Sequence, residues 1–122
     1  MILSPVTVLV VEDEPLLCEL MVDELKTLGF VVLRATTGEE ALRLIDGDEP
    51  VDVLFTDIRL PGRLDGWDVA EQFRMKNPSG PVIYTTGYSG TPVRRVPQSA
   101  FMPKPYRPAA IVKEIRRLSG PA

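Results

Sequence analysis

The sequence contains no histidine and only one cysteine, and these two shortages exclude several kinds of catalytic site. Without an imidazole there is no His base to activate a serine or cysteine nucleophile, and no His-containing zinc site can form. Cys18 has no partner within the chain, so it suits a reducing compartment and a small apolar role on a helix. Chemistry in this chain must therefore depend on carboxylates, hydroxyls and lysine.

Long apolar runs and an excess of positive charge are also missing. The longest apolar runs, such as Val8 to Val11, are far too short to span a bilayer, and residues 1–5 lack the charged-then-apolar pattern of a signal peptide. Lys and Arg number 14 against 17 Asp and Glu, which gives a net charge of −3 and disfavours direct nucleic-acid binding. We expect a cytoplasmic protein without membrane contact, monomeric or weakly dimeric, forming one domain over residues 1–122 with a core at about 5–119.

Apolar strand patterns alternate with helical patterns along the chain. The expected strands lie at residues 6–11, 30–33, 51–57, 82–86 and 100–103. Helical patterns begin at Pro15, after the capping pair Thr37 and Glu40, after the capping residue Asp65, and around Ile111. Residues 89–99 predict only a short helical turn or a loop, because two prolines interrupt them. The alternation predicts an α/β fold with a doubly wound parallel sheet.

Polar side chains end or directly follow four of the expected strands. The residues at these strand ends are Glu12, Asp13, Asp57, Thr86 and Lys104. Because ligands of such sheets bind outside the carboxyl ends of the strands, we expect these side chains to lie together. Three carboxylates repel one another unless a cation neutralises them, and Mg²⁺ prefers oxygen ligands of this kind. The sequence therefore predicts a magnesium site, with Mn²⁺ as an alternative ion.

The same residues suit phosphoryl transfer to a carboxylate. A carboxylate beside a divalent cation can attack phosphorus and form an aspartyl phosphate, and Asp57 fits this role. The lysine ammonium of Lys104 and the hydroxyl of Thr86 can then bind the phosphoryl oxygens without a general base. Gly87, next to Thr86, leaves room for a phosphoryl group or for backbone movement.

The order and spacing of these motifs resemble the receiver domain of bacterial two-component response regulators over nearly the whole chain. The segments that carry the resemblance are 10–14 (VVEDE), 56–62 (TDIRLPG), 65–66 (DG), 85–88 (TTGY) and 104–105 (KP). The resemblance implies a flavodoxin-like fold, with a five-stranded parallel sheet in the order 2-1-3-4-5 flanked by five helices. It also implies a signalling switch rather than an enzyme, with a histidine kinase or histidine phosphotransfer protein as phosphodonor and an unknown downstream protein as target.

Carried over to this chain, the resemblance makes Asp57 the phosphoacceptor. Asp13 and Asp57 would bind Mg²⁺ directly, Glu12 directly or through water, and the main-chain carbonyl of Arg59 would be a further ligand.

The resemblance also implies the switching residues. Thr86 would move toward the phosphoryl group, and Phe101 occupies the position of a switching aromatic residue, where packing alone could report the change. Lys104 would pair with the phosphoryl group, and the Lys104–Pro105 peptide bond would be cis.

Two intervals depart from the family pattern. The loop at residues 61–66 is one residue longer than the common family loop. Lys104 follows Thr86 by 18 positions, which is about four residues, or one helical turn, shorter than usual. We therefore expect the fourth helix of the family fold to be shortened or missing.

Three other functions are open from sequence. A phosphatase of the haloacid dehalogenase type also uses an aspartate nucleophile and Mg²⁺, but such enzymes have a second acid two residues after the nucleophile, where this chain has Arg59. A flavin-binding domain is disfavoured because the loop after the first strand, residues 12–14, is acidic and would repel a phosphate. A constitutive protein-binding scaffold would not need the acceptor residues that the chain retains.

Overall fold

Five parallel strands form one sheet in the order β2-β1-β3-β4-β5 in the computed structural model, which describes residues 5–87 and 94–119. The strands are β1 (Thr7–Val11), β2 (Val31–Ala35), β3 (Val53–Asp57), β4 (Val82–Thr86) and β5 (Ser99–Pro103). The helices are α1 (Pro15–Thr27), α2 (Gly38–Ile45), α3 (Gly66–Lys76) and α4 (Pro108–Leu118). The expected doubly wound architecture and strand order are confirmed.

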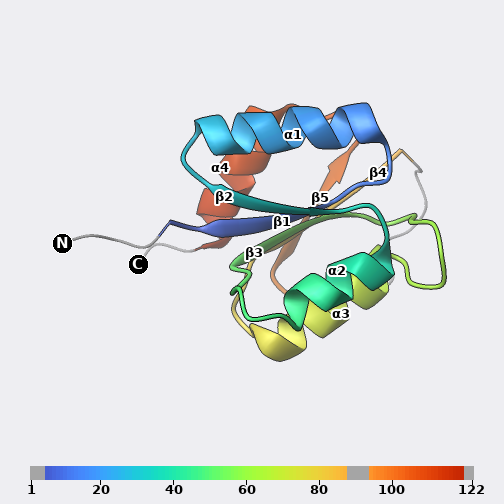
Figure 1. Cartoon of the computed structure of the whole chain (residues 1–122). Coiled ribbons are helices and arrows are strands. Elements are labelled where there is room, and N and C mark those ends of the chain that lie inside the picture. The colour runs from blue at the N-terminus through green and yellow to red at the C-terminus, as the bar shows by residue number, and fades with distance from the viewer. Residues whose placement is uncertain (1–4, 88–93, 120–122) are drawn as a thin grey trace.

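The sheet is the middle layer of three. In Figure 1, α1 and α4 cover one face of the sheet, and α2 and α3 cover the other. Successive residues of a strand point to opposite faces, so Val8 and Val10 of β1 pack with α1 and α4. Leu9 and Val11 pack with α2 and α3. Because β1, β3 and β4 are buried along their whole length, they read in the sequence as nearly continuous apolar runs.

The point where the strand order reverses lies between β1 and β3. The chain pairs β2 with one side of β1 and then returns to place β3 on the other side, with Val11 opposite Thr56. Glu12 and Asp57 are the next residues along these two strands. Ligand sites of open parallel sheets lie at this kind of reversal, so the fold brings two of the candidate acids to the expected position.

Several element boundaries differ from the sequence predictions by one to three residues, and one predicted cap differs as well. Strand β2 runs two residues further than expected, through Arg34, because it is an edge strand with a partly exposed face that tolerates a charged residue. Helix α4 begins at Pro108, three residues before Ile111, since proline suits the first turn of a helix. At the start of α2, Thr37 Oγ1 accepts a hydrogen bond from Glu40 N, but Glu40 Oε1 accepts from Thr36 N, so the predicted reciprocal capping pair is only half formed.

The described residues between β4 and β5 contain no helix. Gly87 and residues 94–98 form turns and irregular structure, and Val96 N donates a hydrogen bond to the Tyr84 hydroxyl, 3.0 Å away. Residues 88–93 lie outside the described residues. They include Tyr88 of the 85–88 motif and part of segment 89–99, for which the sequence predicts a short helical turn or a loop. Within the described ranges the fold therefore has four helices rather than the five of the family pattern.

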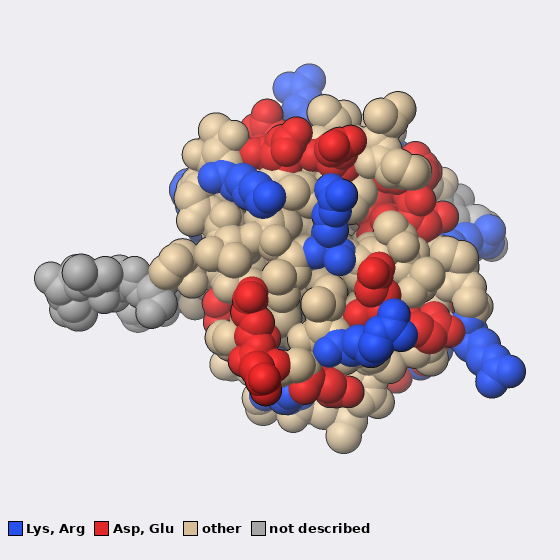
Figure 2. Space-filling view, viewed as in Figure 1, with Lys and Arg blue, Asp and Glu red and all other residues tan. Residues whose placement is uncertain are grey.

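The surface in Figure 2 is mixed in charge, and the helices of the described residues are short. The face in Figure 2 carries interspersed Lys, Arg, Asp and Glu side chains, so no extended field of one sign covers it. None of the helices in the described part of the chain is both long and apolar enough to cross a membrane.

Candidate functional site

Glu12 is a fully buried carboxylate at the end of β1. Its side chain is 0% exposed, and its Oε2 accepts a hydrogen bond from Glu14 N at 3.1 Å. The Glu12 backbone N–H donates to Ala35 O at 3.0 Å, which extends the pairing of β1 with β2 by one step. Asp13, the next residue, is exposed at the mouth of the same region. The strand end thus fixes one acid inside the protein and one at its surface.

Asp57 is the last residue of β3 and is 5% exposed. Its strand neighbour on β4 is Thr85, whose carbonyl accepts a hydrogen bond from Ile58 N at 3.1 Å. Gly66, at the start of α3, lies so close that a Cβ at that position would be 2.1 Å from the Asp57 carbonyl oxygen. The Gly66 N–H also donates to Ile58 O at 2.8 Å. The backbone of Asp57 is therefore held by β4 on one side and by α3 on another.

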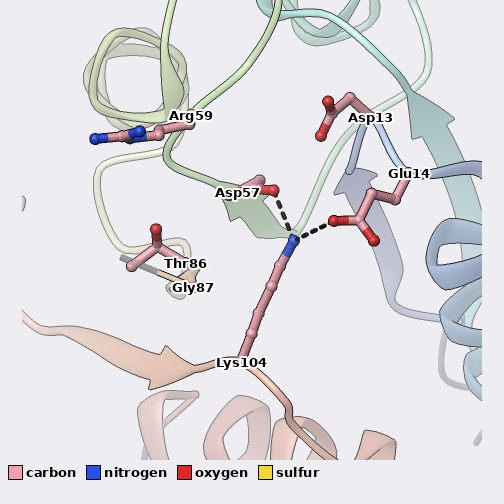
Figure 3. A pocket seen from close by; sticks show the side chains of 7 residues that line it. All are labelled: Asp13, Glu14, Asp57, Arg59, Thr86, Gly87 and Lys104. Carbon is pink, nitrogen blue, oxygen red and sulfur yellow. Dashed lines mark hydrogen bonds and ion pairs between the residues drawn. The ribbon is translucent and has the colours of Figure 1, made fainter. Parts of the chain in front are cut away.

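Lys104 reaches from the end of β5 to the acids at the ends of β1 and β3. Its backbone N–H donates to Thr86 O at 3.0 Å, and the following Lys104–Pro105 peptide bond is cis. Its Nζ lies 2.9 Å from Asp57 Oδ2 and 3.0 Å from Glu12 Oε1. Figure 3 shows the extended side chain pointing at Asp57. A third, longer ion pair of 3.7 Å joins the ammonium to Glu14. One ammonium group thus neutralises part of the acidic cluster.

The electrostatics of Glu12 and Lys104 follow from this arrangement. Burial raises the pKa of Glu12 to about 7, against the lowering effects of the Lys104 ammonium and the Glu14 N–H. Burial acts to lower the pKa of Lys104, but its hydrogen bond to Asp57 and its ion pair with Glu12 outweigh burial and raise that pKa overall. The ammonium therefore stays charged, whereas Glu12 lies close to its titration point near neutral pH.

Glu12, Asp13 and Asp57 can together hold a cation. Each offers one carboxylate oxygen, and these oxygens all lie within 4.8 Å of one another. A set of oxygen donors with surplus negative charge suits a hard divalent ion such as Mg²⁺, which takes one or two protein carboxylates and keeps several waters. The residues present therefore fit the ion that the sequence predicts.

An open cleft of about 420 Å³ lies in front of these acids. Its walls are Asp13, Glu14, Asp57, Arg59, Thr86, Gly87 and Lys104. In Figure 3, Thr86 and Arg59 lie on the side of the cleft opposite Asp13 and Glu14. A Cβ at Gly87 would meet no atom of the described residues within 4 Å, so the backbone leaves open space there. The cleft can thus receive a small anionic group beside Asp57.

Phe101 lies away from this cleft, on the face of the sheet that α2 and α3 cover. It is the neighbour of Tyr84 across the pairing of β4 with β5, and their ring centroids are 6.5 Å apart. Tyr84 in turn contacts Trp67 with centroids 4.8 Å apart. Two residues beyond Tyr84 on the same strand is Thr86, so Phe101 is linked to the cleft through one strand rather than by direct contact.

Sequence reasoning misses two groups at the site. Glu14 lines the cleft and pairs with Lys104, although it is largely exposed; the 10–14 motif includes it but assigns it no role. Gly66 permits the close approach of α3 to Asp57; the sequence marks it only as part of the 65–66 motif and as the residue after the cap Asp65, and neither signal predicts this contact.

Comparisons with known proteins agree with this geometry. The family model described as response regulator receiver domain matches residues 8–116. A cyclic di-GMP phosphodiesterase of Thermotoga maritima is 41% identical over 71% of this chain, which spans only 23% of that relative's length. A response regulator receiver protein of Sinorhizobium medicae has a similar structure, with a TM-score of 0.90 and 29% identity over 95% of both chains.

A third comparison supports the fold. The receiver domain of a sensor histidine kinase, PA1611, from Pseudomonas aeruginosa superimposes with a TM-score of 0.82 and 23% identity over 97% of this chain and 100% of its own. The structure of that protein is described as having a magnesium ion coordinated in its active site cleft.

Proposed function

This chain belongs to the response regulator receiver domains, and from that membership we propose that it is a phosphoacceptor domain in two-component signal transduction. In this proposal, Asp57 accepts a phosphoryl group from a histidine kinase or a histidine phosphotransfer protein. The observation that carries the proposal is the position of Lys104, whose ammonium lies within 3.0 Å of both Asp57 and Glu12 at the floor of an open cleft. Buried acids that share one cation at a strand-order reversal are unusual outside functional sites.

The acids would hold the divalent cation that the transfer requires. Glu12, Asp13 and Asp57 would supply carboxylate oxygens, and we assign the Arg59 carbonyl as a further ligand, with Mn²⁺ able to replace Mg²⁺. When bound, the cation would offset the negative charge on the transferring phosphoryl oxygens. The magnesium ion in the similar receiver domain of Pseudomonas aeruginosa supports this assignment.

The side chains of the cleft would divide the remaining work. A carboxylate oxygen of Asp57 forms a bond to phosphorus while the phosphorus–nitrogen bond of the donor phosphohistidine breaks, and the electron pair stays with the imidazole. The Lys104 ammonium and the Thr86 hydroxyl bind the phosphoryl oxygens, and no general base is needed because an attacking carboxylate has no proton to give up. Gly87 provides the space that the new group occupies.

Phosphorylation would then bias a protein-interaction surface. We assign Thr86 and Phe101 as the switching residues, because Tyr84 joins them: it shares β4 with Thr86 and contacts Phe101. The added charge draws the Thr86 hydroxyl, and the change in β4 reaches the aromatic rings behind it. In this proposal the domain is a cytoplasmic switch, monomeric or weakly dimeric, that takes part in its own phosphorylation and dephosphorylation rather than turning over an external substrate.

Intact-mass measurement after incubation with acetyl phosphate and Mg²⁺ tests the proposal. We expect one added phosphate on the wild type, none on Asp57→Asn, and none when EDTA removes the cation. Asp48→Asn is the matched control, because it removes an exposed carboxylate away from the cleft and should leave phosphorylation unchanged. An unmodified wild type, or equal modification of Asp57→Asn, would refute the assignment of Asp57.

A further inference from the structure

Four buried side-chain oxygens in the described residues have no hydrogen-bond partner of acceptable geometry. They are Glu12 Oε1, Glu39 Oε1, Thr85 Oγ1 and the Tyr106 hydroxyl. A buried polar atom without a hydrogen bond is costly, so each one calls for an explanation. Two of the four, Glu12 Oε1 and the Tyr106 hydroxyl, belong to the same part of the molecule.

The Tyr106 side chain is close enough to the acidic cluster for the charges of Glu12 and Asp57 to act on it. Tyr106 follows Lys104 and the cis-bonded Pro105, and its ring meets Phe55 of β3 edge-on with centroids 5.2 Å apart. The ring packs against the hydrophobic core between the sheet and α1, and Cys18 is one of the residues of this core. Phe55 is two residues before Asp57 on the same strand and on the same face of the sheet, so the phenol ring packs beside the strand that ends at Asp57.

The charges of the site act on this phenol. Burial raises the pKa of Tyr106 most, and the carboxylates of Glu12 and Asp57 follow as the next largest causes. The hydroxyl therefore keeps its proton and is available as a hydrogen-bond donor. Glu12 has the largest charge effect on it, and the Glu12 carboxylate is the acceptor that needs a donor.

The bonding of Glu12 explains why a second donor matters. Its Oε2 is held by Glu14 N, but its Oε1 has only the Lys104 ammonium, 3.0 Å away in an ion pair. In the proposed reaction Lys104 turns to the phosphoryl group, and Oε1 then loses this partner. Ligands of a metal ion are usually oriented by such additional hydrogen bonds, and their loss weakens metal binding.

We propose that Tyr106 is a positioning residue for the acidic site: its hydroxyl donates a hydrogen bond, through one buried water molecule, to Glu12 Oε1 and aims that carboxylate at the cation. A buried water typically satisfies polar atoms that the protein itself leaves unpaired, and here it joins two of them. The inference rests on the proposed function, because it assigns a role in holding the cation that phosphorylation of Asp57 needs.

Calorimetric titration of the full chain with Mg²⁺ tests the inference. Tyr106→Phe keeps the ring on Phe55 and removes only the hydroxyl, so we expect the Kd for Mg²⁺ to rise by about tenfold. The free energy of unfolding in EDTA should fall only slightly, because the ring packing is kept and a single water-mediated hydrogen bond is lost. A purely structural role would give the opposite pattern, with a larger loss of stability and an unchanged Kd.

Two further variants isolate the route through Glu12. Tyr84→Phe removes another buried hydroxyl on the opposite face of the sheet and should leave the Kd for Mg²⁺ unchanged. In a Glu12→Gln background, adding Tyr106→Phe should weaken Mg²⁺ binding no further, because the carboxylate that it orients is gone. A Kd for Tyr106→Phe equal to that of the wild type would overturn the inference and leave the proposed function intact. A wild type that neither binds Mg²⁺ nor accepts phosphate would overturn both.

Discussion

The ammonium of Lys104 lies 2.9 Å from Asp57 Oδ2, although 47 residues separate the two in the sequence. The same ammonium is 3.0 Å from Glu12 Oε1. One lysine directly after the edge strand β5 thus compensates the negative charge of acids at the ends of the two inner strands β1 and β3. Since a buried carboxylate without a partner is costly, Lys104 acts as a tethered counter-ion for the metal-free site. A divalent ion entering among the acids competes with it for the same oxygens.

Lys104→Met should therefore lower stability and strengthen Mg²⁺ binding at the same time. Methionine keeps the length of the side chain but leaves Glu12 and Asp57 without their cation, so we expect a loss of roughly 2–3 kcal/mol in EDTA at pH 8. With the competing ammonium gone, saturating Mg²⁺ should recover most of this loss, and the Kd for Mg²⁺ should fall. Urea unfolding with and without Mg²⁺ measures both effects. Equal losses in the two conditions would show that Lys104 does not share its oxygens with the cation.

The stability of the metal-free protein should fall as pH rises from about 5 to about 7. Burial raises the pKa of Glu12 from 4.5 to about 7, so in this window the folded protein keeps a proton that the unfolded chain has released. The free energy of unfolding then falls by up to about 1.4 kcal/mol per pH unit. Urea unfolding across this range in EDTA should give a shallower slope for Glu12→Gln. Saturating Mg²⁺ should also flatten the wild-type slope, because the ion favours the ionised carboxylate. A slope unchanged by Glu12→Gln would assign the titration to another group.

The strand ends of the site could be predicted from sequence because of how buried parallel strands are built. Strands β1, β3 and β4 are covered on both faces, so each appears as an apolar run that stops where polar residues begin. Glu12, Asp57 and Thr86 are at those stops, and parallel strands bring their carboxyl ends to one edge. Only the family resemblance predicts the strand order, because the apolar pattern does not show which strands are neighbours in the sheet.

The parts that sequence reasoning misses depend on long-range side-chain contacts. The ion pair of Glu14 with Lys104 depends on the conformation of the exposed Glu14 side chain at the cleft. Tyr106 follows a Lys-Pro pair that reads as a turn, and only the fold turns its ring inward against Phe55. The extension of β2 through Arg34 reflects its edge position, because a strand with a wet face tolerates charge.

The close contact of Gly66 with Asp57 predicts that an alanine substitution lowers stability at Gly66 but not at Gly87, although both glycines lie near the cleft. A Cβ at position 66 would be 2.1 Å from the Asp57 carbonyl oxygen, so Gly66→Ala must move either α3 or the end of β3. We expect a loss of about 2–3 kcal/mol and slower phosphorylation by acetyl phosphate. Gly87→Ala is the control, because its Cβ meets no described atom within 4 Å and should change stability little. Thermal unfolding compares the two, and equal stability of both variants would contradict the packing argument.

The last prediction concerns two arginines that fasten residues 94–98 to α3. Arg74 donates to the carbonyls of Gly80, Pro97 and Gln98 at 2.7–2.9 Å, so Arg74→Ala leaves three carbonyls to water and should cost about 1–2 kcal/mol. Arg94 pairs with carboxylates of Asp68 and Glu71 at 2.9 Å, but these groups are half-exposed, and exposed ion pairs contribute little.

Arg94→Ala should therefore change stability only slightly, and less still in high salt, because salt screens exposed charges. Urea unfolding gives the stability of each variant, and amide hydrogen exchange in β5 locates the effect. We expect faster exchange at Ala100 and Phe101 in Arg74→Ala alone, because Arg74 holds the residues that lead directly into this strand. Equal acceleration in Arg94→Ala would mean that the exposed ion pairs, rather than the carbonyl contacts of Arg74, hold the start of β5 in place.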